Sequence, residues 1–221
     1  MESKDKSKEK CKEQNKEKSD IMNLIESLKK INYVKPNEIP NIDLYMDQVT
    51  TFMDRHLESS KRYSEDKLLT KTMINNYTKN NLLPSPNKKK YSKDHMYLLI
   101  FIYYMKNILS ISDIQSILGP MTEKFFGDES KVKLEDIYNE VFRIGQKQAM
   151  TLSKDVVRTF ERSKTTFTRE HGEENEQFLH MFSFISMLCF DVYMKKQLIE
   201  KLIDDNFSVS DGKKESDVNK K

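Results

Sequence analysis

The stretch TKTMINNYTKNNLLPSPNKKKYSK, residues 70–93, contains six lysines and no acidic residue. Thr70 is a suitable N-cap, and the apolar residues that follow predict a short helix beginning after it. We expect this helix to end at Asn80-Asn81, because asparagine tolerates the left-handed conformation common at helix C-termini. The two prolines beyond it disfavour helix and predict an extended connection to a basic loop tip, Asn87–Lys90.

The sequence on both sides of this stretch also has helical periodicity. Apolar residues mark one face of a helix from about residue 43 to about residue 57. The run MYLLIFIYYM, residues 96–105, is apolar almost all round and predicts the buried central element. Ser110 and Asp113 have capping-box spacing and open a short helix, which Gly119-Pro120 is expected to stop.

Two long helical patterns follow, at about 134–167 and 174–206, preceded much earlier by a short one at 21–34. The run FLHMFSFISMLCFDVYM, residues 178–194, is interrupted by His180 and Asp191, so we expect a core or subunit-interface helix rather than a membrane span. The residues expected on its inward side, with their continuation, are Phe178, Phe182, Ile185, Cys189, Val192, Ile199 and Leu202.

The formal net charge of +3 hides a strong segregation along the 221 residues. Residues 61–93 hold nine basic and two acidic side chains, whereas 94–207 hold fourteen basic and eighteen acidic ones. Both chain ends, 1–20 and 208–221, are dense in mixed charge and poor in apolar residues, which predicts disordered tails. A local basic block of this kind is the electrostatic signature of a phosphate-binding surface.

Signs of catalysis are weak. The four histidines are scattered without metal-ligand spacing and are expected to be surface or half-buried residues, and the adjacent carboxylate pairs point to different sides of their helices. Five glycines offer no phosphate-cradling loop, and Cys11 and Cys189 are too far apart in sequence for a disulfide framework. We therefore predict a cytoplasmic protein that is not an enzyme and has no catalytic residues, metal or cofactor.

Three landmarks carry a family resemblance: Thr72-Met-Ile-Asn-Asn-Tyr77, Asn81-Leu-Leu-Pro84 and Tyr91-Ser92-x-x-His95. Their order and spacing resemble the MerR-type winged helix-turn-helix. They resemble more closely a bacterial family of unknown function, mainly from low-GC Gram-positive organisms, that carries such a domain. The match covers about residues 43–118 and implies a recognition helix at 70–79 and a wing at 84–91.

The resemblance and the chemistry of the side chains together give the candidate DNA-binding residues. Asn75 and Lys71 are candidates for base contacts, since asparagine pairs with adenine and lysine with guanine. Thr72 and Lys79 are expected at phosphates, and the lysines of the wing at phosphates or a minor groove, although a solvated loop is the other interpretation of that triplet. The full set is Lys71, Thr72, Asn75, Asn76, Lys79, Lys88, Lys89 and Lys90.

The sequence thus predicts a mainly α protein, with a MerR-like winged helix-turn-helix domain followed by a C-terminal module of long helices. Its predicted function is that of a transcriptional regulator that binds double-stranded DNA and forms a homodimer through its C-terminal helices, with a small-molecule effector left open and no membrane association. The alternative is a non-catalytic protein–protein interaction module with a degenerate helix-turn-helix fold. The expected divisions are a tail at 1–20, a short helix and linker at 21–40, the DNA-binding domain at 41–120, the helical module at 121–207 and a tail at 208–221.

Overall fold

The computed structural model describes residues 19, 21–23, 25–26, 34–127, 131–167 and 173–207. Apart from Ser19, the predicted tails at 1–20 and 208–221 lie outside these residues. The helix predicted over 21–34 lies partly outside them, and its described positions 21–23 and 25–26 are helical.

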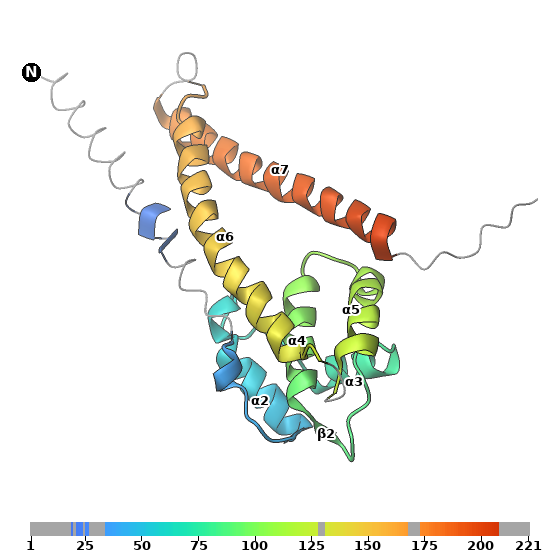
Figure 1. The fold of residues 1–221 in the computed structure, drawn as a ribbon. Coiled ribbons are helices and arrows are strands. Elements are labelled where there is room, and N and C mark those ends of the chain that lie inside the picture. Colours follow the sequence, from blue (N-terminus) through green and yellow to red (C-terminus); the bar gives the residue numbers. More distant parts are fainter. Residues whose placement is uncertain are drawn as a thin grey trace, which may run out of the picture. The chain divides into compact units, whose positions relative to one another are not determined.

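The fold is mainly α, as predicted, with one small antiparallel sheet (Figure 1). In chain order the elements are a 3₁₀ helix at Pro36–Glu38, β1 (Leu44–Tyr45), α2 (Met46–His56), a 3₁₀ helix at Glu58–Ser60, α3 (Lys71–Lys79), β2 (Lys90–Tyr91), α4 (Lys93–Met105), α5 (Ile111–Phe125), α6 (Leu134–Ser163) and α7 (Glu173–Phe207).

These elements fall into two compact units. One comprises residues 1–39, 51–68 and 135–193, and the other comprises 40–50, 69–134 and 194–221. The lysine-rich stretch 70–93 therefore lies entirely within the second unit.

The core of the second unit is α4. Every residue from His95 to Tyr103 is buried, which confirms the central element predicted from its all-round apolar sequence. The strand β1 pairs antiparallel with β2, in the register Leu44↔Tyr91 and Tyr45↔Lys90. The helix predicted from about residue 43 therefore begins only at Met46, because the two residues before it extend to pair with β2.

Helix α5 begins as predicted and ends later than predicted. Ser110 and Asp113 form the capping box, with the Asp113 N–H donating to Ser110 Oγ at 3.1 Å. The expectation that Gly119-Pro120 stops the helix is wrong, since α5 continues to Phe125. Proline removes one helical hydrogen bond, but Pro120 is exposed, where water can hydrate the carbonyl left without a partner.

The ends of α3 agree with the sequence prediction. Thr70 is the N-cap, and its Oγ1 accepts from the Met73 N–H at 3.2 Å. At the other end Asn81 has φ of 55°, in the left-handed region, and the Leu82 N–H donates to the Tyr77 carbonyl at 2.9 Å. This is the Schellman arrangement, in which a left-handed residue reverses the chain and the next apolar residue packs back on the helix.

The first unit contains most of α6 and the first part of α7. Tyr138 of α6 donates its hydroxyl to the Val34 carbonyl at 2.5 Å, which ties the start of this helix to the segment preceding β1. Phe160 near the end of α6 meets Phe184 of α7 edge to face, with ring centroids 5.3 Å apart. Helix α6 ends at Ser163 rather than near residue 167, and Phe167 is exposed with φ of 58°.

The inward face predicted for α7 is wrong. Phe178, Phe182 and Val192 are 68%, 58% and 61% exposed, and the whole predicted set is at least partly exposed. Over Asn175–Phe207 this helix is long and apolar enough to cross a membrane by length and composition. Only 6% of its most apolar window is buried, so α7 is not the core helix that was one of the two expectations. The pattern identified an apolar stripe, but α7 has apolar residues on several sides, and its contact with Phe160 of α6 is made by Phe184, which lies outside the predicted set.

The two asparagines at the end of α3 provide a matched test of the capping geometry. Asn81→Gly should raise the free energy of unfolding by about 0.5–1 kcal/mol, because glycine adopts positive φ without steric cost. Asn80→Gly should lower it by a similar amount, since Asn80 has φ of −94° and only the added chain entropy counts there. Urea unfolding of both variants measures the difference, and equal effects at the two positions would contradict the left-handed cap.

Candidate nucleic-acid interface

Helix α3 separates its residues into a buried and an exposed side. Ile74 and Tyr77 are buried and fix the helix on its unit. The five predicted binding residues of α3 are all exposed, so they are available to a ligand. They are Lys71, Thr72, Asn75, Asn76 and Lys79.

The N-terminal end of α3 carries an ion pair that the sequence did not indicate. Lys71 Nζ pairs with Asp47 of α2, and both side chains are more than half exposed. The first turn of α3 contains no acidic residue, so no carboxylate within the helix neutralises the positive end of its dipole. The start of α3 therefore carries a lysine beside the positive end of the helix dipole, and Asp47 of α2 is the anion that pairs with this lysine.

The predicted wing is a tight hairpin between Asn87 and Lys90. The Lys90 N–H donates to the Asn87 carbonyl at 2.9 Å, and the two residues form an antiparallel bridge. Lys88 and Lys89, the central residues, have φ of 48° and 64°. Two successive positive φ angles define a type I′ turn, which normally contains Asn-Gly or Gly-Gly because a Cβ is disfavoured there.

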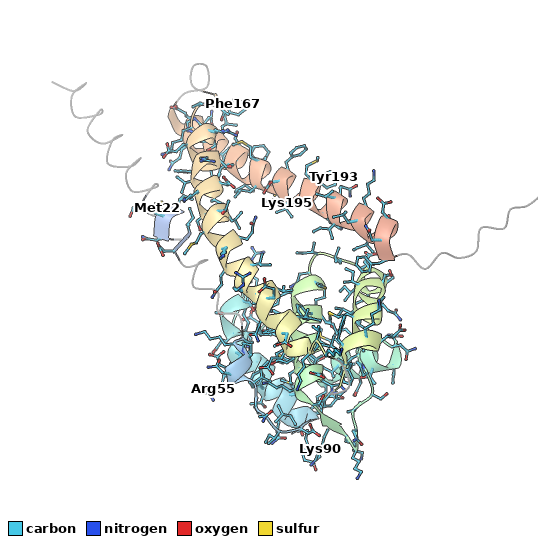
Figure 2. All side chains as sticks on the ribbon, viewed as in Figure 1. Met22, Arg55, Lys90, Phe167, Tyr193 and Lys195 are labelled. Carbon is cyan, nitrogen blue, oxygen red and sulfur yellow. The ribbon has the colours of Figure 1, made fainter. Side chains whose placement is uncertain are left out.

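The three wing lysines do not share one environment. Lys88 and Lys89 are exposed at the tip of the hairpin. Lys90 is half-buried and belongs to β2 (Figure 2). Its Nζ lies 5.2 Å from the centroid of the Tyr45 ring on the paired strand. This cation–π contact orients the Lys90 side chain, whereas the two tip lysines keep their rotamer freedom.

His95 fixes the base of the hairpin. It is only 4% exposed, and its Nδ1 accepts from the Ser92 N–H at 3.0 Å, which closes a capping box at the start of α4. Its ring meets Tyr91 of β2 edge to face at 5.4 Å between centroids, and Phe126 at 4.8 Å. The prediction that every histidine is surface or half-buried is therefore wrong for His95.

Burial lowers the pKa of His95, because the charged imidazolium loses its hydration. The backbone of Ser85 and Pro84 and the nearby carboxylates raise this pKa, but they offset the desolvation only in part. His95 thus packs against Tyr91 on the chain leaving the hairpin and lies near the backbone of Pro84 and Ser85 on the chain entering it.

Two features of this surface were missed from sequence, namely the capping box between Ser92 and His95 and the ion pair that Asp47 forms with Lys71. The S-x-x-H spacing at 92–95 matched part of the family landmarks, but its role as a capping box became evident only from the structure. Asp47 gave no sequence signal, since its contact with Lys71 depends on tertiary packing. Across the described ranges 34–127, 131–167 and 173–207, no three His, Cys, Asp or Glu side chains cluster in a way that could hold a metal ion.

Comparison with known proteins gives one match. Residues 34–141 match the model of a family described as Domain of unknown function DUF1836, just under half of the chain. No curated protein and no solved structure matches the chain significantly. The matched residues contain β1, β2, α2 to α5 and the start of α6, and thus the whole lysine-rich surface.

The buried His95 makes stability depend on pH. Its folded-state pKa lies below the unfolded value of about 6.5, so the unfolded chain takes up a proton first as the pH falls. The free energy of unfolding should therefore decrease below pH 6.5, by at most about 1.4 kcal/mol per pH unit from this group.

The variant His95→Gln tests this assignment, because glutamine keeps an acceptor for the Ser92 N–H but does not titrate. Urea unfolding between pH 5 and pH 7.5 should show a smaller pH dependence in the variant than in the wild type. The same slope in both proteins would contradict it.

Proposed function

We propose that this chain binds double-stranded DNA through the exposed side of α3 and the lysine-tipped hairpin, and acts as a transcriptional regulator. In this proposal α3 is the recognition helix of a MerR-like winged helix-turn-helix, and residues 87–90 are the tip of its wing. The sequence resemblance over about 43–118 supports the fold assignment. The concentration of positive charge in residues 61–93 supports DNA as the ligand.

The observation that carries the proposal is the pair of lysines in the left-handed turn. A non-glycine residue in this conformation costs about 1–2 kcal/mol, and a turn selected for stability alone favours Asn-Gly. Lys88 and Lys89 instead combine an unfavourable backbone with two exposed charges. Strained conformations of this kind persist at functional positions, and a pair of cations at a hairpin tip suits contact with phosphates.

Helix α3 supplies side chains suited to reading base edges. Asn75 and Asn76 are exposed near its middle and can each pair bidentately with adenine in the major groove. Lys71 and Lys79, at its two ends, are placed for phosphates on either side, and Lys71 can exchange Asp47 for a phosphate oxygen. In this arrangement the phosphate contacts give affinity and the asparagines give sequence preference.

The hairpin variant Lys88→Asn/Lys89→Gly separates stability from DNA binding. It should raise the free energy of unfolding by about 1–2 kcal/mol, because Asn-Gly relieves the positive-φ strain. It should also reduce the log–log salt dependence of DNA affinity by about 2, at roughly 0.9 for each phosphate that a lysine neutralises. Urea unfolding and fluorescence-anisotropy titration of a random duplex at several salt concentrations measure the two effects.

A charge-matched control is Lys124→Asn/Lys131→Asn, which removes two exposed lysines outside the 70–93 stretch. It should leave the salt dependence close to the wild-type value, because neither lysine belongs to the proposed interface. An equal reduction in both double variants would show that only net charge matters and would refute the wing assignment. Absence of wild-type binding to random duplex at micromolar protein and low salt would refute DNA binding itself.

Asn75→Ala tests base recognition by α3. The preferred duplex is selected from genomic fragments that the wild type retains. On this duplex the variant should lose about 1–3 kcal/mol of binding free energy, while its binding to random duplex should stay nearly constant. Asn80→Ala removes an exposed asparagine from the C-cap of the same helix and should change neither value. Equal losses on preferred and random duplex in Asn75→Ala would count against base reading.

The alternative function, a non-catalytic protein–protein interaction module, is favoured by the apolar exposure of α7. The two functions separate on the random-duplex titration, because a chain that binds only proteins should show no salt-dependent affinity for DNA.

A further inference from the structure

His95, in the first turn of α4, lies where three other segments of the second unit meet. Its ring meets Tyr91 of β2 edge to face, and it meets Phe126, the C-cap of α5, in the same geometry. The backbone of residues 84–85, which leads into the hairpin, lies near this ring as well. The buried imidazole therefore joins the base of the hairpin to the start of α4 and the end of α5.

The hydrogen bonds of His95 determine which ring nitrogen carries the proton. The Ser92 N–H donates to Nδ1 at 3.0 Å, and the Ser92 Oγ lies 2.8 Å from the same nitrogen. A ring nitrogen that accepts from an N–H has no proton of its own, so the proton of the neutral ring is on Nε2. Nε2 is buried, and no side chain within the described residues accepts from it.

A second proton on this ring is incompatible with the closed arrangement. It would attach to Nδ1, where it would face the Ser92 N–H and break the capping box of α4. The imidazolium would also stand in the first turn of α4, at the positive end of the helix dipole. Loss of hydration on burial disfavours the charge as well and lowers the pKa of His95.

The charged and titratable groups around His95 do not remove this conflict. Asp94 on α4 and Asp43 before β1 both raise the pKa of His95, but burial outweighs them. Burial also raises the pKa of the Tyr91 phenol, so this group stays neutral at physiological pH. The Nζ of Lys93 lies over an aromatic ring one turn further along α4. The surroundings of His95 therefore favour its neutral form.

We propose that His95 is a pH-sensitive latch, which holds the hairpin Asn87–Lys90 closed when it is neutral and releases it when it is protonated. In the released state the ring leaves Tyr91 and Phe126 and reaches water, which hydrates the imidazolium. Helix α4 stays in place, because its residues from Met96 to Tyr103 are buried. The latch differs from a loss of global stability, since the hairpin opens while its unit stays folded. It does not depend on DNA binding.

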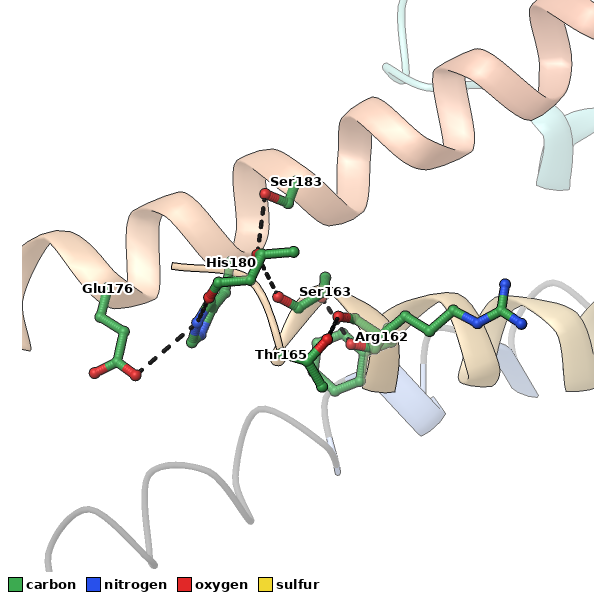
Figure 3. Close-up of polar contacts among 8 residues, drawn as sticks. Arg162, Ser163, Thr165, Glu176, His180 and Ser183 are labelled. Atoms are coloured by element: carbon green, nitrogen blue, oxygen red, sulfur yellow. Dashed lines mark hydrogen bonds and ion pairs between the residues drawn. The ribbon is translucent and has the colours of Figure 1, made fainter. Parts of the chain in front are cut away.

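His180 provides a contrast, because its surroundings can accept a positive charge. Its Nε2 donates to the Thr166 carbonyl at 2.8 Å and lies 3.9 Å from the Glu176 carboxylate (Figure 3). The carbonyl accepts from the neutral and from the charged ring alike, and the carboxylate can pair with the imidazolium. Protonation of His180 therefore breaks no contact of this kind, which makes it the matched control.

Amide hydrogen exchange of the full chain, followed by NMR, tests the latch. The protection factor divides the exchange rate of an unstructured chain by the measured rate, so the pH dependence of the exchange chemistry cancels. For the Lys90 N–H, which donates to the Asn87 carbonyl, this factor reports how often the hairpin opens. Because the released histidine binds a proton with a pKa of about 6.5, the factor should fall about tenfold between pH 7.5 and pH 5.5.

The variants His95→Gln and His180→Gln separate the latch from other titrating groups. Glutamine keeps an acceptor for the Ser92 N–H and does not titrate, so the Lys90 protection factor should be nearly independent of pH in His95→Gln. In His180→Gln it should fall as in the wild type. The same pH dependence in all three proteins would overturn the latch.

Two measurements on the wild type need no variant. The Lys90 amide should exchange faster than the Ile100 amide inside α4, and its protection should still fall with pH. A fall for Ile100 alone would show that His95 takes up its proton only on global unfolding, which overturns the latch. Nitrogen-15 NMR should find Nδ1 of His95 unprotonated at pH 7.5, and a proton on that nitrogen would overturn it too.

Discussion

The burial of α4 on all its sides is the constraint on which the DNA-binding candidate surface depends. A helix with nine consecutive buried residues needs cover in every direction, and the β1–β2 pair and α5 belong to the same compact unit around it. The hydrophobic free energy of these side chains sets the positions of the chain segments that join them. The exposed lysines between residues 70 and 90 then lie on the outer side of α3 and at the tip of the hairpin.

Within this frame, local stability and surface charge are in conflict at two places. At the hairpin tip, Lys88 and Lys89 adopt a backbone conformation that glycine and asparagine prefer. At the start of α3, Lys71 stands at the positive end of the helix dipole, where an acidic residue is favourable. Both departures place positive charge where the local backbone conformation or the helix dipole disfavours it. Departures from local rules concentrate at functional sites. These two positions therefore support the proposed DNA-binding surface more strongly than the number of lysines does.

Much of the second unit could be predicted from sequence because its signals are local. The Thr70 cap, the left-handed Asn81 and the all-round apolar run of α4 each depend on a few neighbouring residues. The predictions that failed depend on residues that are far apart in the sequence. The strand at Leu44–Tyr45 forms by pairing with β2, and no residue before Met46 indicates that pairing.

The same distinction explains α7 and His95. Periodicity located the apolar stripe of α7, but choosing the side that packs requires knowledge of Thr166 and Phe160. The residue type of His95 suggested partial exposure, whereas tertiary packing against Tyr91 and Phe126 buries it. The exposure of the candidate residues on α3 could be predicted from sequence, while the contact of Lys71 with Asp47 and the separate environment of Lys90 could not.

The tight turn at Lys88-Lys89 also has a consequence for proteolysis. Lys88 and Lys89 at the exposed tip form an obvious trypsin site, yet a protease needs several residues in an extended conformation, and a two-residue turn cannot supply them. Cleavage there must wait until the hairpin opens, which requires breaking the Lys90–Asn87 hydrogen bond and loosening the packing around His95. The rate of tryptic cleavage at this site therefore reports how often this hairpin opens.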